Sequence, residues 1–163
     1  MTRLDLWNAR PPGKVRALRA YLTISVPAHR KALTRLLLSD HALAVEVLRR
    51  PDRYRHAVGP REDRLCRMCR GAVEDEVHAL LQCRGHAELI NLREDFLRRL
   101  EALGVRRDPP RDDHWEMRLI WWLADHKQVE VRGLWAHFVF RVFAVFETVP
   151  IFVLQRYKTR TVA

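Results

Sequence analysis

The chain has little glycine, very little lysine and an odd number of cysteines. Its 163 residues include 6 glycines, 4 lysines and 3 cysteines. With no low-complexity tract and no internal repeat, neither a disordered chain nor a repeat array is expected. Three cysteines cannot all pair within one chain, and the opening residues 1–14 contain no apolar run of signal-peptide length. We therefore expect an intracellular protein, nuclear or cytoplasmic, rather than a secreted disulfide scaffold.

Signatures of catalysis and of membrane insertion are also missing. The sequence contains no nucleophile–base pair, no phosphate-binding loop and no metal site with an open position, so we expect a non-enzymatic protein without a small-molecule substrate. The most apolar segment, residues 133–154, contains Arg141 and Glu147. Charges at that depth in lipid are costly, so we expect a helix buried in a protein core and no membrane contact.

The apolar residues recur at helical spacing and make up enough of the chain, 48% hydrophobic, to fill a core. The expected fold is all-α: a small multi-helix bundle in one domain, residues 1–163, with a zinc-knuckle-like insert between N-terminal and C-terminal helices. The sub-regions are residues 12–50 (helices 12–24, 28–38 and 41–50), the basic arm 51–65, the knuckle 66–86, a helix over 87–104, and aromatic-rich helices within 112–155, the last over 133–154.

Single residues predict where helices begin and end and where the chain leaves the knuckle. Ser39 and Asp40 are good N-cap residues for the helix over 41–50, and His41 is expected on the surface. Gly104 suits the C′ position of the helix over 87–104. Gly71 is expected to adopt positive φ where the chain leaves the knuckle. The acidic run 74–76 is interpreted as helix capping rather than acid/base catalysis.

All three cysteines lie in the stretch CRMCRGAVEDEVHALLQC, with the spacing Cys66-x2-Cys69-x8-His78-x4-Cys83. Three thiolates and one imidazole form a closed tetrahedral set for a structural zinc ion. The spacing leaves His86 open as an alternative fourth ligand, because Cys83-x2-His86 would pair with Cys66-x2-Cys69. Inert buried thiols are the competing interpretation.

The formal charge is +10, and 26 of the 30 cationic residues are arginine. Basic charge favours anionic partners, and arginine both matches phosphate and stacks on bases. We therefore predict binding to RNA or single-stranded DNA. The predicted contact residues lie just before and within the knuckle: Arg53, Tyr54, Arg55, Arg61, Arg64, Arg67 and Arg70. A solvated linker and a GC-rich coding bias are alternative explanations of this arginine content.

The aromatic C-terminal helix offers a second hypothesis. Its aromatic side chains exceed what a small core is expected to cover, which indicates a docking surface for a protein partner. They are Trp135, Phe138, Phe140, Phe143, Phe146 and Phe152. In this alternative, zinc only stabilises the fold of a protein-interaction module.

The run REDRLCRMCRGAVEDEVHALLQCRGHAELINLREDFL resembles the zinc-binding segment C-terminal to the polymerase of non-LTR retrotransposon reverse transcriptases. The shared features are a CxxC pair, a glutamate before a histidine, an apolar pair, a third cysteine and an arginine-containing helix. They correspond here to Cys66, Cys69, Glu74 or Glu76, His78, Leu80–Leu81, Cys83 and Arg93.

This resemblance extends over about residues 30–100, since the upstream run KALTRLLLSDHALAVEVLRR is similar too. It implies that His78 rather than His86 is the fourth ligand. The chain has no polymerase palm, no aromatic-x-Asp-Asp motif and no endonuclease domain. The resemblance therefore implies a free-standing derivative, either a relic or a domesticated protein, that engages nucleic acid without polymerase activity.

Overall fold

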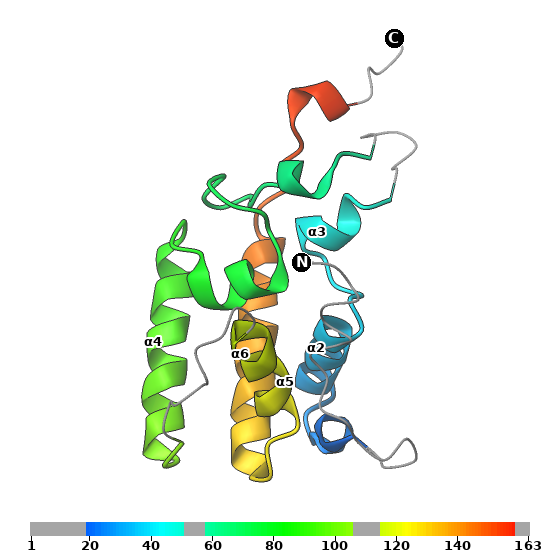
Figure 1. Ribbon diagram of the computed structural model, residues 1–163. Helices are drawn as coiled ribbons and strands as arrows, with labels where there is room; N and C mark the ends of the chain where they lie inside the picture. Colours follow the sequence, from blue (N-terminus) through cyan, green and yellow to red (C-terminus); the bar gives the residue numbers. More distant parts are fainter. Residues whose placement is uncertain (1–18, 51–57, 106–114, 159–163) are drawn as a thin grey trace.

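The computed structural model describes residues 19–50, 58–105 and 115–158 (Figure 1). Within these ranges the chain is helical and forms no strand, only the isolated bridge between Leu65 and Val73. The predicted all-α bundle with a zinc-knuckle-like insert is confirmed. In chain order the helices and helical turns are η1 (Ala20–Thr23), α2 (Pro27–Leu37), α3 (Ala44–Val47), η2 (Arg61–Asp63), η3 (His78–Gln82), α4 (Ala87–Ala102), α5 (Trp115–Ala124), α6 (Val129–Glu147) and η4 (Gln155–Tyr157).

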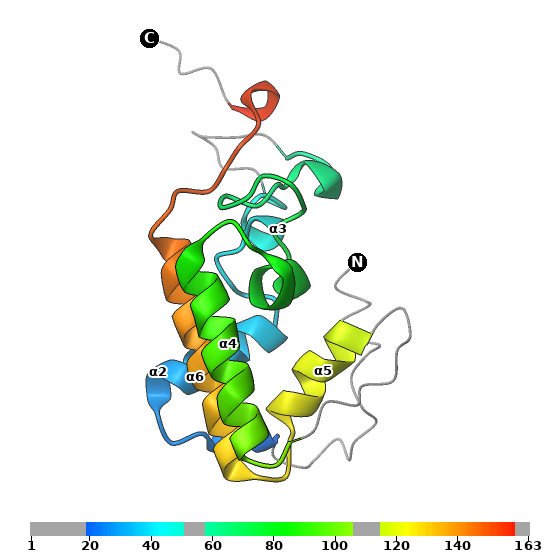
Figure 2. The same ribbon diagram turned by 90° about the vertical axis from the view of Figure 1, so that its left-hand side faces the viewer.

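Helix α6 is the centre of the bundle. It is apolar on most sides, as expected for a helix surrounded by others, and it packs against α2, α4 and α5. Helices α2, α6 and α4 lie side by side, and α5 covers one face of α6 (Figures 1 and 2). The aromatic side chains Trp135, Phe138 and Phe146 are buried in this core. Half of the six aromatic side chains predicted for partner docking are therefore buried, while Phe140, Phe143 and Phe152 are partly exposed.

Helix α4 follows its predicted register. Leu89, Phe96 and Leu100 are buried on one face, and the ring of Phe96 stacks on Phe138 of α6 with centroids 4.6 Å apart. His86 is the N-cap residue. Gly104 follows the helix with φ of +73°, so its predicted role at C′ is confirmed.

Two predicted N-terminal helices are much shorter than expected. Of the helix predicted over 12–24, residues 12–18 lie outside the described residues, and the rest forms only the 3₁₀ turn η1. The helix predicted over 41–50 shrinks to α3, whose N-cap is Leu43 with no side-chain cap bond. Ser39 and Asp40 are not its caps. Ser39 has φ of +54°, and the N–H groups of both residues donate to the last turn of α2, so they end that helix.

The last helix also has different ends. It begins at Val129 and ends at Glu147, whereas residues 133–154 were predicted. It starts four residues earlier than predicted, and its end precedes Pro150, which cannot continue a helical hydrogen-bond ladder. Among the described residues, no helix is long and apolar enough to cross a membrane.

Candidate metal centre

Cys66 and Cys69 are positioned by a tight turn that the Leu65–Val73 bridge closes. The N–H of Cys66 donates to Ala72 O at 2.8 Å, and the N–H of Arg70 donates to Cys66 O at 2.8 Å. The left-handed residue of this turn is Arg70, with φ of +55°, so the prediction of positive φ at Gly71 was one residue too late. The turn brings both sulfurs of the CxxC pair to one side.

His78 and Cys83 stand at the two ends of a π turn, η3. The side chain of Asp75 accepts a hydrogen bond from the N–H of His78 at 2.9 Å and so begins the turn. The N–H of Cys83 donates to His78 O at 2.7 Å, which closes an i to i+5 ring. A five-residue separation is therefore one full π turn, and both side chains face the CxxC pair.

The four ligand atoms lie within 4.8 Å of one another. The sulfurs of Cys66 and Cys83 are 3.6 Å apart, and Cys69 Sγ is 3.3 Å from His78 Nε2. A tetrahedral ion with thiolate and imidazole ligands places sulfurs about 3.8 Å apart and sulfur and nitrogen about 3.6 Å apart. Cys66, Cys69, His78 and Cys83, hereafter the metal centre, therefore lie close enough to hold one metal ion.

His86, the alternative ligand, has a different role. As the N-cap of α4, it uses Nδ1 to accept a hydrogen bond from the N–H of Glu88 at 3.2 Å. It is not part of the group of side chains that converge on the metal centre.

The two buried sulfurs are unequal. The thiol of Cys66 donates a hydrogen bond to Cys83 and is desolvated, which raises its pKa to about 12. Accepting that bond lowers the pKa of Cys83. A metal ion must displace the thiol protons on binding, because the ligand is the thiolate.

Gly85 is required by a close approach of two backbones. A Cβ at this position would lie 2.6 Å from Met68 C and 2.7 Å from Cys69 N. Only glycine lets the chain after Cys83 pass against the CxxC turn without displacing it. The sequence alone does not reveal this contact, because the two backbones meet only in the tertiary structure.

Comparisons with protein-family models, curated proteins and solved structures found no match.

Arg93 supports the ligand turn from α4. Its guanidinium donates to Leu80 O at 2.8 Å, to Ala79 O at 3.1 Å and to Cys83 O. These carbonyls belong to η3 and its end, so Arg93 satisfies groups that the turn leaves unpaired. Only the resemblance to the reverse transcriptase segment singled out this position.

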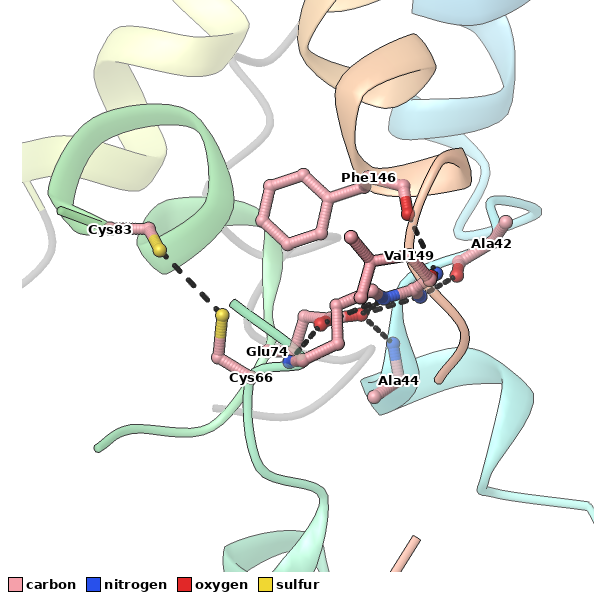
Figure 3. A network of polar contacts seen from close by, with 8 residues as sticks. Ala42, Ala44, Cys66, Glu74, Cys83, Phe146 and Val149 are labelled. Atoms are coloured by element: carbon pink, nitrogen blue, oxygen red, sulfur yellow. Dashed lines mark hydrogen bonds and ion pairs between the residues drawn. The ribbon is translucent and has the colours of Figure 1, made fainter. Parts of the chain in front are cut away.

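Arg67, predicted to bind phosphate, lies inside the protein. It pairs with the fully buried Glu74 at 2.7 Å and donates to three carbonyls, those of Ala42, Phe146 and Val149. The Glu74 carboxylate also accepts from the N–H of Ala44, and this network lies beside Cys66 and Cys83 (Figure 3). Because its donors are used within the chain, Arg67 joins the metal-centre segment to α6 and to the start of α3.

The other residues predicted to contact nucleic acid differ in their burial and in their partners. Arg53, Tyr54 and Arg55 lie outside the described residues. Arg61 is half-buried and pairs with Asp75 at 2.6 Å. Arg64 donates to Gly59 O and Val45 O. Arg70 is exposed, and its guanidinium lies 4.7 Å from the ring centroid of Phe152.

A second buried ion pair escaped sequence reasoning. His41, expected on the surface, is buried, and its Nε2 lies 2.9 Å from Glu76 Oε1. The imidazole lowers the pKa of Glu76 even though burial acts in the opposite direction. Within the acidic run 74–76, only Asp75 caps a helical turn as predicted. Glu74 pairs with the buried Arg67, and Glu76 pairs with the buried His41.

Proposed function

We propose that the metal centre binds a structural zinc ion. Three thiols and one imidazole at tetrahedral spacing are the donor set that zinc prefers, and four protein ligands leave no open position for water. The role of the ion is then to hold the CxxC turn against η3. On this basis we infer that the site is structural and that the protein is not an enzyme.

Metal analysis of the purified protein tests this proposal. We expect one zinc per chain, lost in His78→Ala and retained in His86→Ala. Retention of zinc in His78→Ala, or its loss in His86→Ala, would overturn the ligand assignment. Absence of zinc from the unmodified protein after reconstitution under reducing conditions would overturn the proposal itself.

We further propose that the protein binds RNA or single-stranded DNA through an arginine-rich end next to the metal centre. The supporting observation is a pair of cation–aromatic contacts, of which the first joins the CxxC turn to the chain after α6. Arg70 lies over Phe152, and Arg156 lies over Tyr157 at 5.1 Å. A guanidinium placed beside an aromatic ring offers positive charge to a phosphate and an aromatic neighbour to a base.

The second contact is tied to Asp63, in the segment that leads into the CxxC turn. The hydroxyl of Tyr157 donates to Asp63 at 2.6 Å, and Arg156 pairs with the same carboxylate. This links η4 to the chain just before the CxxC turn, next to Arg61 and Arg64. We call Arg61, Arg64, Arg70 and Arg156, with Phe152 and Tyr157, the arginine-rich end. Zinc with three thiolates has a net charge near −1, so attraction for phosphate must come from these arginines.

Binding to single-stranded RNA and DNA oligonucleotides at several salt concentrations tests the proposal. We expect affinity to fall steeply as salt rises, because neutralised phosphates release counterions. Arg70→Gln should weaken binding about threefold to tenfold, the effect of one lost phosphate or stacking contact. Arg98→Gln, a change at another exposed arginine on α4, is the matched control. No binding at low salt, or equal loss in both variants, would refute the proposed interface.

We propose that the segment from Cys66 to Arg93 derives from the zinc-binding tail of a non-LTR reverse transcriptase. The support is the order of Cys66, Cys69, His78 and Cys83, followed by Arg93, which contacts the ligand turn. The alternative remains a protein-interaction module. Exposed Trp122 and Val129 favour it, and binding to a protein partner through them would persist at high salt.

A further inference from the structure

The three cysteines of the metal centre differ in their access to solvent. Cys66 and Cys83 are fully buried, whereas Cys69 is exposed. The chain enters the CxxC turn at the buried Cys66 and leaves it through two residues that are exposed as well, Arg70 and Gly71. A dissolved reagent therefore reaches Cys69 before it reaches either of the other two ligand cysteines.

Cys69 also takes the chemical form that oxidants attack when an ion is bound. The nucleophile in thiol oxidation is the thiolate, and a cysteine that binds zinc is held as a thiolate. Its neighbour Arg70 is exposed and adds positive charge beside it. Reactive cysteines in proteins have such electropositive, partly exposed surroundings. Cys69 thus combines access, thiolate character and a nearby cation.

Two further thiols lie next to Cys69. The four ligand atoms lie within 4.8 Å of one another, so the sulfurs of Cys66 and Cys83 are both within that distance of the Cys69 sulfur. A disulfide bond is about 2.0 Å long, so an approach of less than about 3 Å joins Cys69 to either of them. Oxidation-sensitive cysteines are often paired with a second cysteine that resolves the first oxidation product. The metal centre supplies two candidates for this role.

The fold of the chain itself keeps these cysteines together. A Cβ at Gly85, two residues after Cys83, would lie 2.8 Å from Cys69 Cβ, so the two segments are in close contact. The N–H of Cys66 donates to Ala72 O and closes the CxxC turn. The sulfurs therefore stay near one another while the ion leaves, and a disulfide can form without a large rearrangement.

We propose that Cys69 is the residue at which a hydroperoxide, such as hydrogen peroxide, oxidises the metal centre and so releases its ion. This proposal rests on the structural zinc ion proposed above and adds a means of regulating it. Zinc occupancy then depends on the balance between hydroperoxide and thiol reductant around the protein.

The reaction has two steps. The Cys69 thiolate attacks one oxygen of the hydroperoxide, the O–O bond breaks, and Cys69 becomes a sulfenic acid while an alkoxide, or hydroxide from hydrogen peroxide, leaves. The thiolate of Cys66 or Cys83 then attacks the sulfenic sulfur, a disulfide forms and hydroxide leaves. The two sulfurs lose two electrons to the peroxide, and two protons from the solvent convert the leaving groups into an alcohol and water. With two of its four ligands in a disulfide, the site no longer holds the ion.

Treatment of the zinc-loaded full chain with hydrogen peroxide tests the site. A chromophoric indicator follows released zinc, and samples quenched with acid and N-ethylmaleimide are digested with trypsin. Because trypsin cleaves after arginine, each cysteine lies in its own peptide: residues 65–67, 68–70 and 71–84. We expect the first disulfide to contain peptide 68–70 and to form at the rate of zinc release. A thiol reductant with added zinc should restore the loaded protein.

Cys69→His gives a second test. Two cysteines and two histidines also form a structural zinc set, and imidazole cannot enter a disulfide. We expect this variant to bind one zinc and to retain it at a peroxide dose that empties the unmodified protein. Met68→Leu is the matched control, because it removes the other oxidisable side chain of the same turn and conserves volume. It should release zinc as the unmodified protein does.

The outcomes separate this proposal from the zinc proposal. Absence of zinc from the unmodified protein after reconstitution would overturn both. Bound zinc that peroxide does not release, or a first disulfide that joins Cys66 to Cys83, would overturn the oxidation site alone. Equally fast release from Cys69→His and the unmodified protein would do the same. If Cys69→His does not bind zinc, the disulfide map of the unmodified protein decides.

Discussion

The close approach at Gly85 allows a sharp test of how the metal centre is built. In Gly85→Ala the new Cβ would lie 2.6 Å from Met68 C, 2.7 Å from Cys69 N and 2.8 Å from Cys69 Cβ. All three are backbone or Cβ atoms, so no side-chain rotation can relieve the clash. The CxxC turn or the chain after Cys83 must move instead.

The required movement is large on the scale of a metal site. Ordinary contact for a Cβ begins at 3.4 Å, so the backbones must separate by about 0.8 Å, whereas ligand distances in a well-formed site hold within about 0.2 Å. Overpacking of this kind costs about 1–3 kcal/mol. If that strain falls on the zinc-bound state, the affinity for zinc drops about 5-fold to 150-fold, at 1.4 kcal/mol for each factor of ten.

Competition with a chromophoric chelator measures this affinity. Gly71→Ala is the matched control in the same segment, because its Cβ would meet only Cys69 O at 3.8 Å and its φ is not positive. We expect the control to bind zinc within about twofold of the unmodified protein, with the small change of an unstrained surface substitution. Equal zinc affinity in Gly85→Ala and Gly71→Ala would refute the reasoning.

Three further changes probe the supports of the metal centre and the bundle. Arg67→Met should lower the free energy of unfolding by about 3–5 kcal/mol in chemical denaturation, since it leaves Glu74 buried without its cation; a loss below about 1 kcal/mol would contradict this. Arg93→Gln should weaken zinc binding about tenfold by chelator competition, because the charge-assisted bonds to the carbonyls of η3 are lost; an unchanged affinity would show that the turn holds itself. For His137 the pKa is lowered in the folded state, so the unfolded chain binds more protons and stability falls as pH drops below its ordinary pKa of 6.5. His137→Asn should flatten this dependence between about pH 7.5 and pH 5 in denaturation curves, and an unchanged slope would contradict it.

The metal centre was the most predictable part of the molecule, because its spacing has a local cause. One tight turn fixes Cys66 and Cys69, and one π turn fixes His78 and Cys83, so most of the geometry is built within eighteen residues of sequence. Helices with strongly periodic apolar residues were predicted equally well: α2 and α4 match their predicted ranges within a residue or two. Gly104 was recognisable because a residue of positive φ after a helix is usually glycine.

The sequence-based predictions were wrong where a contact with a distant part of the chain determines the local structure. Ser39 and Asp40 carry N-cap chemistry, yet packing ends α2 there and delays the next helix to Ala44, whose N–H donates to the Glu74 side chain. Arg67 looks in the sequence like any other arginine of a basic run. Only the fold shows that its partners are Glu74 and carbonyls up to 82 residues away. The local sequence pattern does not distinguish a buried arginine from a solvated one.

The position of Arg67 also determines what the metal can do for the rest of the protein. Arg67 follows Cys66 directly and donates to Phe146 O and Val149 O, at the C-terminal end of α6. A metal ion that fixes the CxxC turn therefore also fixes the last turn of the central helix. The chain then leaves α6 toward Phe152, whose ring centroid lies 4.7 Å from the guanidinium of Arg70 in the same CxxC turn. The metal centre and the arginine-rich end are thus connected through backbone geometry. Charge does not connect them, because zinc with three thiolates has a net negative charge and does not attract phosphate. In the function that we propose, an ion at this place supports the binding surface without touching what that surface binds.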